Sequence, residues 1–227
     1  MATYDDFLSE IQGRAYGVSE PQVEQYVRIA AIEFCETTRL WTRQVQEYAF
    51  KGDGRVDITG FDEDQEDFEA LVMGPYNGIQ VVPIPPMMSG SELNSYAAAN
   101  FEGMQQGHPA YVFELPEETS TVGVWPIPDK QYADLTFKII LKPSTTATIL
   151  PDFLQKNWRR AIIEGALMHI HGLMGMSYTD PRREATAMKK FENAKLAGRI
   201  AANRGRAVDG NLTVQMRPFS FGSQRRG

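Results

Sequence analysis

The spacing of hydrophobic residues changes twice along this chain of 227 residues, and that change constrains the fold more than any other feature. Apolar residues recur about every 3.6 residues, as in a helix, up to about residue 43. From residue 44 to 144 they alternate as in a strand, and the helical period returns at Pro151. Because helices and strands bury different faces, we expect an α+β protein with a helical part and a strand part.

Two helices are expected before the strands. The first covers residues 3–12, with Thr3 as its N-cap. The second follows the cap residue Ser19, carries Pro21 in its first turn and runs to about Arg43. Its apolar stripe is wide, which implies burial on more than one side. The stripe consists of Val23, Val27, Ala30, Phe34 and Trp41, widened by Ile29, Ile32 and Cys35.

Two more helices are expected after the strands. One begins at Pro151, where the missing N–H costs nothing, and reaches roughly Met174. The last follows the N-cap Asp180, has Pro181 at its first position and runs to about Asn203. Its expected inward residues are Met188, Phe191, Ala194 and Ala201, and its expected outward residues are Arg182, Lys189, Lys195 and Arg199.

Between the helices, short alternating segments predict strands separated by Gly, Pro and Asp clusters. These segments are residues 45–51, 55–59, 70–73, 78–84, 110–115, 121–127 and 133–142. Their spacing is typical of an antiparallel β-sandwich or barrel. The sequence "FDEDQEDFEA" at residues 61–70 is too charged for a buried strand, so we expect a loop or a short exposed turn there. The stretch at residues 91–103 is expected to be one small helix or an irregular arm.

The order of these elements predicts the domain organisation. Two helical hairpins that each expose an apolar stripe bury it most easily against each other. We therefore expect a helical bundle of four helices, two N-terminal and two C-terminal, built from residues 1–44 and 150–204. The antiparallel β domain is inserted as residues 45–149. Residues 205–227 have no helical period and are expected to form an extended C-terminal tail.

Several classes of protein are disfavoured by composition. No run of eighteen apolar residues is present, so we expect no membrane span. The start "MATYDDFLSE" is acidic and lacks the apolar core of a secretion signal. Cys35 is the single cysteine, which excludes an internal disulfide and suits a reducing compartment.

Candidate metal and catalytic residues are few. His169 and His171 are two apart in a predicted helix, so their side chains diverge by about 200° and cannot hold one ion together. The sequence "DEDQED" resembles the start of a calcium loop but lacks its glycine and its final carboxylate. No phosphate loop, "GxSxG" or "HExxH" is present. We expect no cofactor, no metal and no enzymatic activity.

The charges are segregated along the chain. Residues 151–227 carry 14 Lys/Arg against 6 Asp/Glu, whereas residues 1–150 carry 9 against 23. Opposite charges in one chain suit attraction between copies or toward partner proteins. A basic patch for nucleic acid could form from a set of six cations, but the acidic middle opposes phosphate binding. The six are Arg159, Arg160, Arg182, Arg183, Lys189 and Lys190.

Three stretches, in this order, resemble the head-to-tail adaptor (connector) proteins of tailed bacteriophages, and they cover about half of the chain. The first ends a helix with "CETT" and a tryptophan, the second combines "PIP", "KPS", "LPD" and "EGAL", and the third opens a helix with "YTDP". They read "IAAIEFCETTRLWTRQVQEY", "VWPIPDKQYADLTFKIILKPSTTATILPDFLQKNWRRAIIEGAL" and "MGMSYTDPRREATAMKKFENAKLAGRIAANRG".

This resemblance implies a non-enzymatic virion protein of the phage neck, assembled in the host cytoplasm. It implies a homo-oligomeric ring, a 12-mer in such proteins, that binds the portal protein and a tail, nozzle or neck protein. The ring would extend the DNA channel, with genomic DNA as non-specific cargo. The C-terminal tail of the family often docks on the portal. Here the tail offers Val214, Met216, Arg217, Phe219, Phe221, Arg225 and Arg226 as candidate partner-binding residues.

Two other functions remain open at this stage. Another neck or tail component, such as a tail terminator or tube protein, would share the β domain but should lack the second helical hairpin. A nucleic-acid-binding accessory protein would instead bind nucleic acid without a partner, with an affinity that falls steeply with salt.

Overall fold

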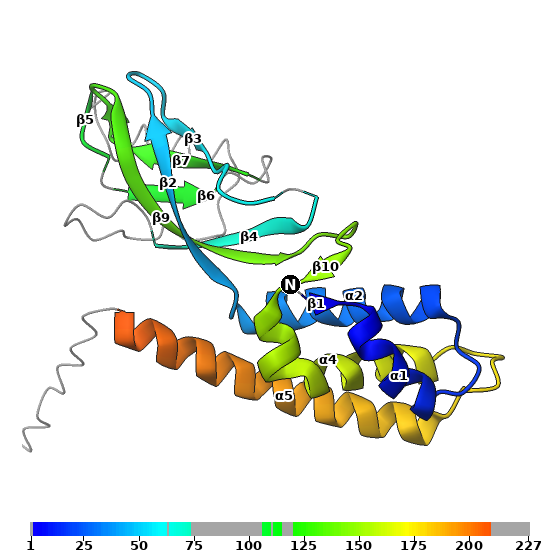
Figure 1. Cartoon of the computed structure of the whole chain (residues 1–227). Helices are drawn as coiled ribbons and strands as arrows, with labels where there is room; N and C mark the ends of the chain where they lie inside the picture. The colour runs from blue at the N-terminus through cyan, green and yellow to red at the C-terminus, as the bar shows by residue number, and fades with distance from the viewer. Residues whose placement is uncertain (1, 63, 74–105, 110, 115–119, 210–227) are drawn as a thin grey trace, which may run out of the picture.

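The computed structural model describes residues 2–62, 64–73, 106–109, 111–114 and 120–209. Helices and strands occupy separate parts of the molecule, so the expected α+β class is confirmed (Figure 1). All but one of the described strand pairs are antiparallel. The described helices form one part, which we refer to as the helical body: α1 (Asp5–Arg14), α2 (Glu20–Thr38), α4 (Asp152–His171) and α5 (Pro181–Asp209).

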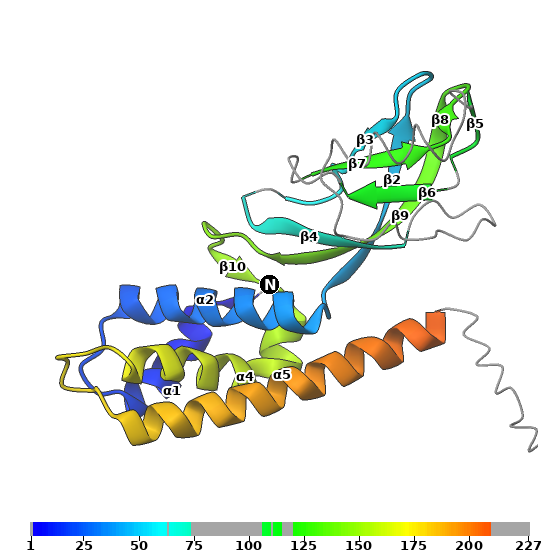
Figure 2. The ribbon, with the colours of Figure 1, turned by 180° about the vertical axis from the view of Figure 1, so that it is seen from behind.

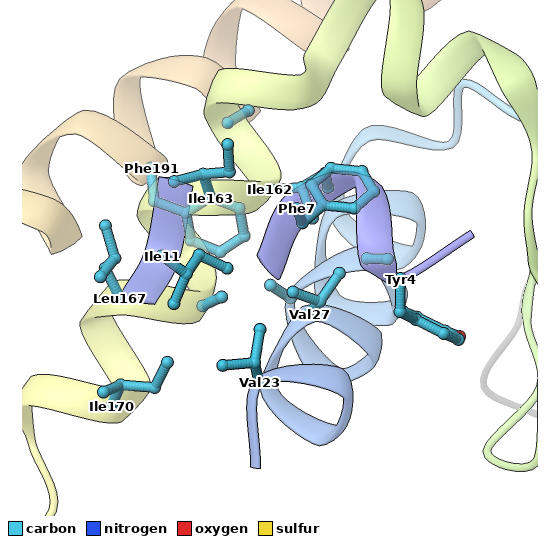
Figure 3. Packing of buried hydrophobic residues seen from close by; sticks show 14 of the residues in the cluster. Tyr4, Phe7, Ile11, Val23, Val27, Ile162, Ile163, Leu167, Ile170 and Phe191 are labelled. Atoms are coloured by element: carbon cyan, nitrogen blue, oxygen red, sulfur yellow. The ribbon is translucent and has the colours of Figure 1, made fainter. Parts of the chain in front are cut away.

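The helical body is held by a core to which both ends of the chain contribute. Side chains of α1, α2 and α4 converge with Phe191 of α5 in one apolar cluster (Figure 3). The Phe34 ring lies 5.1 Å from the Trp158 ring and 6.3 Å from the Phe191 ring. Gly165 permits this approach, because a Cβ there would lie 2.8 Å from Ala30 and 2.9 Å from Phe191.

The N-terminal helices begin and end differently from the prediction in two places. Thr3 does not cap α1, because residues Ala2–Thr3 form the short strand β1, which pairs with β10 (Ile149–Leu150). Ser19 does cap α2, with reciprocal contacts to Gln22. This helix ends at Thr38 rather than Arg43, because Arg39 adopts a left-handed conformation (φ 53°) and the chain enters strand β2 (Thr42–Ala49).

The C-terminal helices begin as expected. Pro151 is the N-cap of α4, and the Asp180 carboxylate accepts hydrogen bonds from the N–H groups of Arg182 and Arg183 at the start of α5. The first of these helices ends at His171 rather than Met174, and the second continues past the predicted end to Asp209.

The predicted faces of α5 are partly wrong. Met188 is 51% exposed and Ala201 is also exposed, whereas the Lys195 side chain is only 8% exposed. The buried row instead follows Ala187, Phe191, Gly198 and Ala202. Small residues in this row let α5 approach α2 closely, since a Cβ on Gly198 would lie 2.5 Å from Thr38.

The described strands form two three-stranded antiparallel sheets, one short parallel pair and the antiparallel pair β1–β10. The first sheet has the order β2-β9-β4, and the second has the order β3-β7-β6. Side chains from both sheets share a second core. The bounds are β3 (Arg55–Asp57), β4 (Glu66–Met73), β6 (Tyr111–Glu114), β7 (Thr121–Trp125) and β9 (Tyr132–Pro143), with β5 (Gln106–Gly107) parallel to β8 (Ile127–Pro128).

The acidic stretch at residues 61–70 is not a loop throughout, contrary to the prediction. Its second half begins β4, which pairs with β9 from Glu66 onward. The strand tolerates its charges because two of its three carboxylates, those of Glu66 and Glu69, are paired within the chain. The Arg43 guanidinium donates to both carboxylate oxygens of Glu66, at 2.6 and 2.5 Å, and Lys142 lies 3.0 Å from Glu69. Charge alone therefore did not exclude a strand, because Arg43 of β2 and Lys142 of β9 bind two of the carboxylates.

The expectations for residues 78–84 and 91–103 lie outside the described residues, as does that for the tail at residues 210–227.

Candidate interaction surfaces

The junction between the helical body and the strand part (β2–β9) is held by a half-buried network of charges. Lys142 of β9 lies 2.9 Å from Glu36 of α2 and 3.0 Å from Glu69 of β4. Partial burial by itself lowers the pKa of Lys142, but the hydrogen bonds to the two carboxylates outweigh it and raise the pKa above 10.5. One ammonium group therefore joins a helix to two strands.

The return crossing from the strands to α4 is also fixed by hydrogen bonds. The hydroxyl of Tyr4 donates to the carbonyl oxygen of Ala147 at 2.8 Å, and the Arg28 side chain donates to the same oxygen at 2.9 Å. The backbone N–H of Ser144 donates to the carbonyl oxygen of Gln65. The crossing is thus tied to the first helices and to the loop before β4, so the geometry indicates a fixed joint between the two parts.

The turn between α1 and α2 and the turn between α4 and α5 lie at the same end of the helical body (Figure 2). Both turns carry exposed apolar side chains. Tyr16 is 91% exposed, Met174 93% and Met176 47%. Beside Tyr16 lies a hollow of about 270 Å³ that Arg14 and Arg183 help to line. Sequence reasoning missed this surface, although three large apolar residues in turns that contain Gly17 and Gly175 could have signalled it.

Two further groups of apolar residues are exposed. Tyr48 and Phe50, 56% and 58% exposed, lie at the end of β2 far from the helical body. Met188, Leu196 and Ile200 are exposed along α5. Side chains of this size are common at the centres of protein interfaces, so each group is a candidate contact surface.

The histidines have separate structural roles. The His171 ring is buried and its Nδ1 lies 2.8 Å from the carbonyl oxygen of Tyr178, which holds the turn before α5. The His169 ring stacks on Tyr26, and its Nε2 lies 3.5 Å from a Glu33 oxygen. Within the part of the chain that the structure describes, no group of three or more His, Cys, Asp or Glu residues could hold a metal ion.

The remaining candidates from the sequence are placed as follows. Cys35 is fully buried, and burial raises the pKa of its thiol, so the reactive thiolate is disfavoured. Among the basic residues of the possible nucleic-acid patch, Arg159 donates to the carbonyl oxygen of Asp6 at 2.6 Å and Lys190 lies 3.2 Å from Glu164. Those two cations are held within the chain rather than presented together to phosphates.

The seven candidate partner-binding residues of the tail, from Val214 to Arg226, lie outside the described residues. No described helix combines the length and the apolar character needed to cross a membrane. A scan of the chain against models of protein families finds no match, and a search of the curated proteins finds no relative.

Proposed function

We propose that this chain is the subunit of a head-to-tail adaptor ring in a tailed bacteriophage. The ring binds the portal, connects the capsid to the tail and extends the DNA channel. The observation that carries the proposal is the ordered set of three stretches that resemble such adaptors, from "IAAIEFCETTRLW" through "KPSTTATILPDF" to "SYTDPRRE".

The arrangement of these stretches in space supports the proposal. Each one includes a place where a helix meets a strand or another helix: the end of α2, the crossing from β9 to α4, and the start of α5. The stretches therefore specify how a helical part and a strand part are joined. In the proposal the helices form a four-helix bundle that packs into the ring, and the inserted β-sandwich or barrel points toward the tail.

Only some of the acidic residues of the strand part could repel DNA from the channel in the proposal. A strongly acidic wall could repel DNA from the channel. Glu66 and Glu69, however, are paired with Arg43 and Lys142. Repulsion of DNA would rest on exposed carboxylates such as Asp57, Asp62 and Asp64.

Portal binding by the C-terminal tail provides the test. A chain lacking residues 211–227 should keep its helical circular dichroism and lose binding to the portal protein of the same phage. In the full-length chain, Phe219→Ala with Phe221→Ala should weaken portal binding at least about tenfold. The matched control, Ser220→Ala with Ser223→Ala, should bind like the wild type. Undiminished binding by the shortened chain would contradict the docking role.

Electron microscopy of the chain mixed with that portal tests the ring itself. A symmetric ring on the portal is expected. Absence of any association would contradict the adaptor function. Binding to DNA that needs no portal and falls steeply with salt would favour the nucleic-acid-binding alternative instead.

A further inference from the structure

The side of α5 that faces away from the core carries five exposed residues that are either aliphatic or basic. We refer to them as the α5 outer face: Arg182, Lys189, Leu196, Ile200 and Arg204. At about 100° per residue, all five lie within about 40° of the direction opposite Phe191, which is fully buried. Leu196 and Ile200 are 59% and 46% exposed and form an aliphatic pair between the basic residues.

The three cations of the α5 outer face are free to bind a partner. No described group forms an ion pair or a hydrogen bond with the side chain of Arg182, Lys189 or Arg204. They differ in this from Lys190 and Lys195 of the same helix, which bind Glu164 and Glu33. Their attraction for carboxylates is therefore not already satisfied within the described chain.

Acidic residues do not share this face within the described part of α5. The helix has two of them up to Arg204. Glu184 lies on the core side, about 20° from Phe191, and Glu192 binds Lys195. A partner for the α5 outer face should therefore offer apolar side chains bordered by carboxylates.

The C-terminal part of α5 extends beyond the rest of the helical body (Figures 1 and 2). Neither of the two cores contains a described residue of α5 after Ala194, yet the helix continues to Asp209. A helical segment without core contacts is only marginally stable in water, so a partner is expected to support it. This end leads directly into residues 210–227, to which the proposed function assigns partner binding. A partner held by those residues lies next to the α5 outer face.

The aliphatic pair favours a protein over nucleic acid as the partner. Phosphates would attract the three cations, but a DNA backbone offers no apolar surface to Leu196 and Ile200. Burial of these two side chains is favourable only against other apolar atoms. An acidic protein surface with an apolar centre satisfies both the cations and the aliphatic pair.

We propose that the α5 outer face binds an acidic surface with an apolar centre on the protein that the tail binds. Leu196 and Ile200 pack against apolar side chains at the centre of this contact. Arg182, Lys189 and Arg204 lie against carboxylates at its rim. The inference deepens the proposed adaptor function and rests on it, because that function identifies the partner as the portal.

Glutamine substitutions test the apolar centre without adding charge. Leu196→Gln with Ile200→Gln should weaken binding of the full-length chain to the portal protein of the same phage at least about tenfold. Met188→Gln is the matched control, because Met188 is 51% exposed but lies about 60° from Phe191, outside the α5 outer face. The control should bind like the wild type. Circular dichroism checks the fold, and the tail is intact in every variant.

Arg204→Gln tests the basic rim of the contact. The change should lower the rate constant of association with the portal and make it less dependent on salt, because a charge at a rim acts mainly on the encounter. Arg199→Gln is the matched control, since Arg199 is also exposed but lies about 100° around the helix from Ile200. An effect of the control as large as that of Arg204→Gln would contradict carboxylates opposite the α5 outer face.

Portal binding separates failure of this contact from failure of the adaptor function. Leu196→Gln with Ile200→Gln could bind like the wild type while Phe219→Ala with Phe221→Ala binds more weakly. That result would overturn the contact and leave the adaptor function intact. A wild-type chain that does not bind the portal would contradict the adaptor function and this contact together.

Two other occupants of the α5 outer face would also overturn the proposal. One is DNA, shown by binding of a duplex of about 30 base pairs that Arg204→Gln weakens and Leu196→Gln with Ile200→Gln leaves unchanged. The other is a second copy of the chain. Sedimentation would reveal it as self-association of the wild type that the Leu196→Gln and Ile200→Gln variant loses.

Discussion

The helical body and the strand part are assembled from opposite kinds of contact. In the body, Phe34 packs against Trp158 and Phe191, more than a hundred residues away in the chain. The core of the strand part comes from one continuous stretch, from Val45 to Leu141. The difference teaches that one region can take its core from a single continuous stretch while the other depends on segments that precede and follow that stretch.

Pairing of β2 with β9 explains how this arrangement is possible. These strands are the entry to and the exit from the strand part, and Thr42 lies opposite Ile140. The chain therefore enters and leaves the strand part at neighbouring positions, so the helices before and after it can pack against each other. Neighbouring ends are the geometry that permits one structural unit to be inserted into another.

Loss of a buried aromatic residue from each region should have the largest effect. We expect Phe191→Ala in the body and Phe137→Ala in the strand part each to cost about 3–5 kcal/mol, because both side chains are fully buried. Hydrogen exchange under native conditions should show each loss mainly in its own region. Equal weakening of both regions by either change would mean that they unfold as one unit.

Removal of the charge at the junction should have a smaller effect on both regions. Lys142→Met leaves Glu36 and Glu69 without their shared cation, and we expect a loss of about 1–2 kcal/mol. Since the folded state raises the Lys142 pKa, the stabilisation is complete below pH 10.5 and is lost as the pH rises through the higher folded value. Chemical denaturation should show that the free energy of unfolding of the wild type falls by this contribution of Lys142 above pH 10.5. The variant should show no such fall.

Lys156→Met is the control for that measurement, because Lys156 also pairs with a carboxylate but is exposed and lies within one helix. It should leave the stability of the strand part unchanged. An equal effect of the two changes would mean that the junction network does not couple the regions.

The smallest effect is expected from the Glu164 carboxylate, which pairs with two cations in the helical body. Burial by itself raises the pKa of Glu164, but its contacts with Arg14 and Lys190 outweigh it and lower the pKa below 4.5. The stabilisation is therefore present above pH 4.5 and is lost as the pH falls through the folded value. Glu164→Gln should reduce the fall in the free energy of unfolding of the helices at acid pH, which we call the acid limb of the stability profile. An unchanged limb would show that other carboxylates determine acid unfolding.

Local sequence signals predicted the elements well where the backbone conformation depends on residues within the same turn. The caps Ser19 and Asp180 and the break at Pro151 were correct, because capping and the missing proline N–H act within one turn. The candidate contact surface formed by Tyr16, Met174 and Met176 was missed, since the exposure of a turn residue depends on what packs beside it.

The sequence by itself determined the alternation of helix, strand and helix, because the spacing of apolar residues follows the repeat of each backbone conformation. Tertiary structure alone decided which charges are buried and which apolar residues are exposed. Glu66 could enter a strand because the Arg43 guanidinium binds its carboxylate, and Lys195 is buried because Glu33 and Glu192 bind it. Met188 is exposed because Ala187 and Phe191, rather than Met188, face the core. These outcomes depend on partners that are distant in sequence, and the free energy of a charge depends on such partners more than on its own segment.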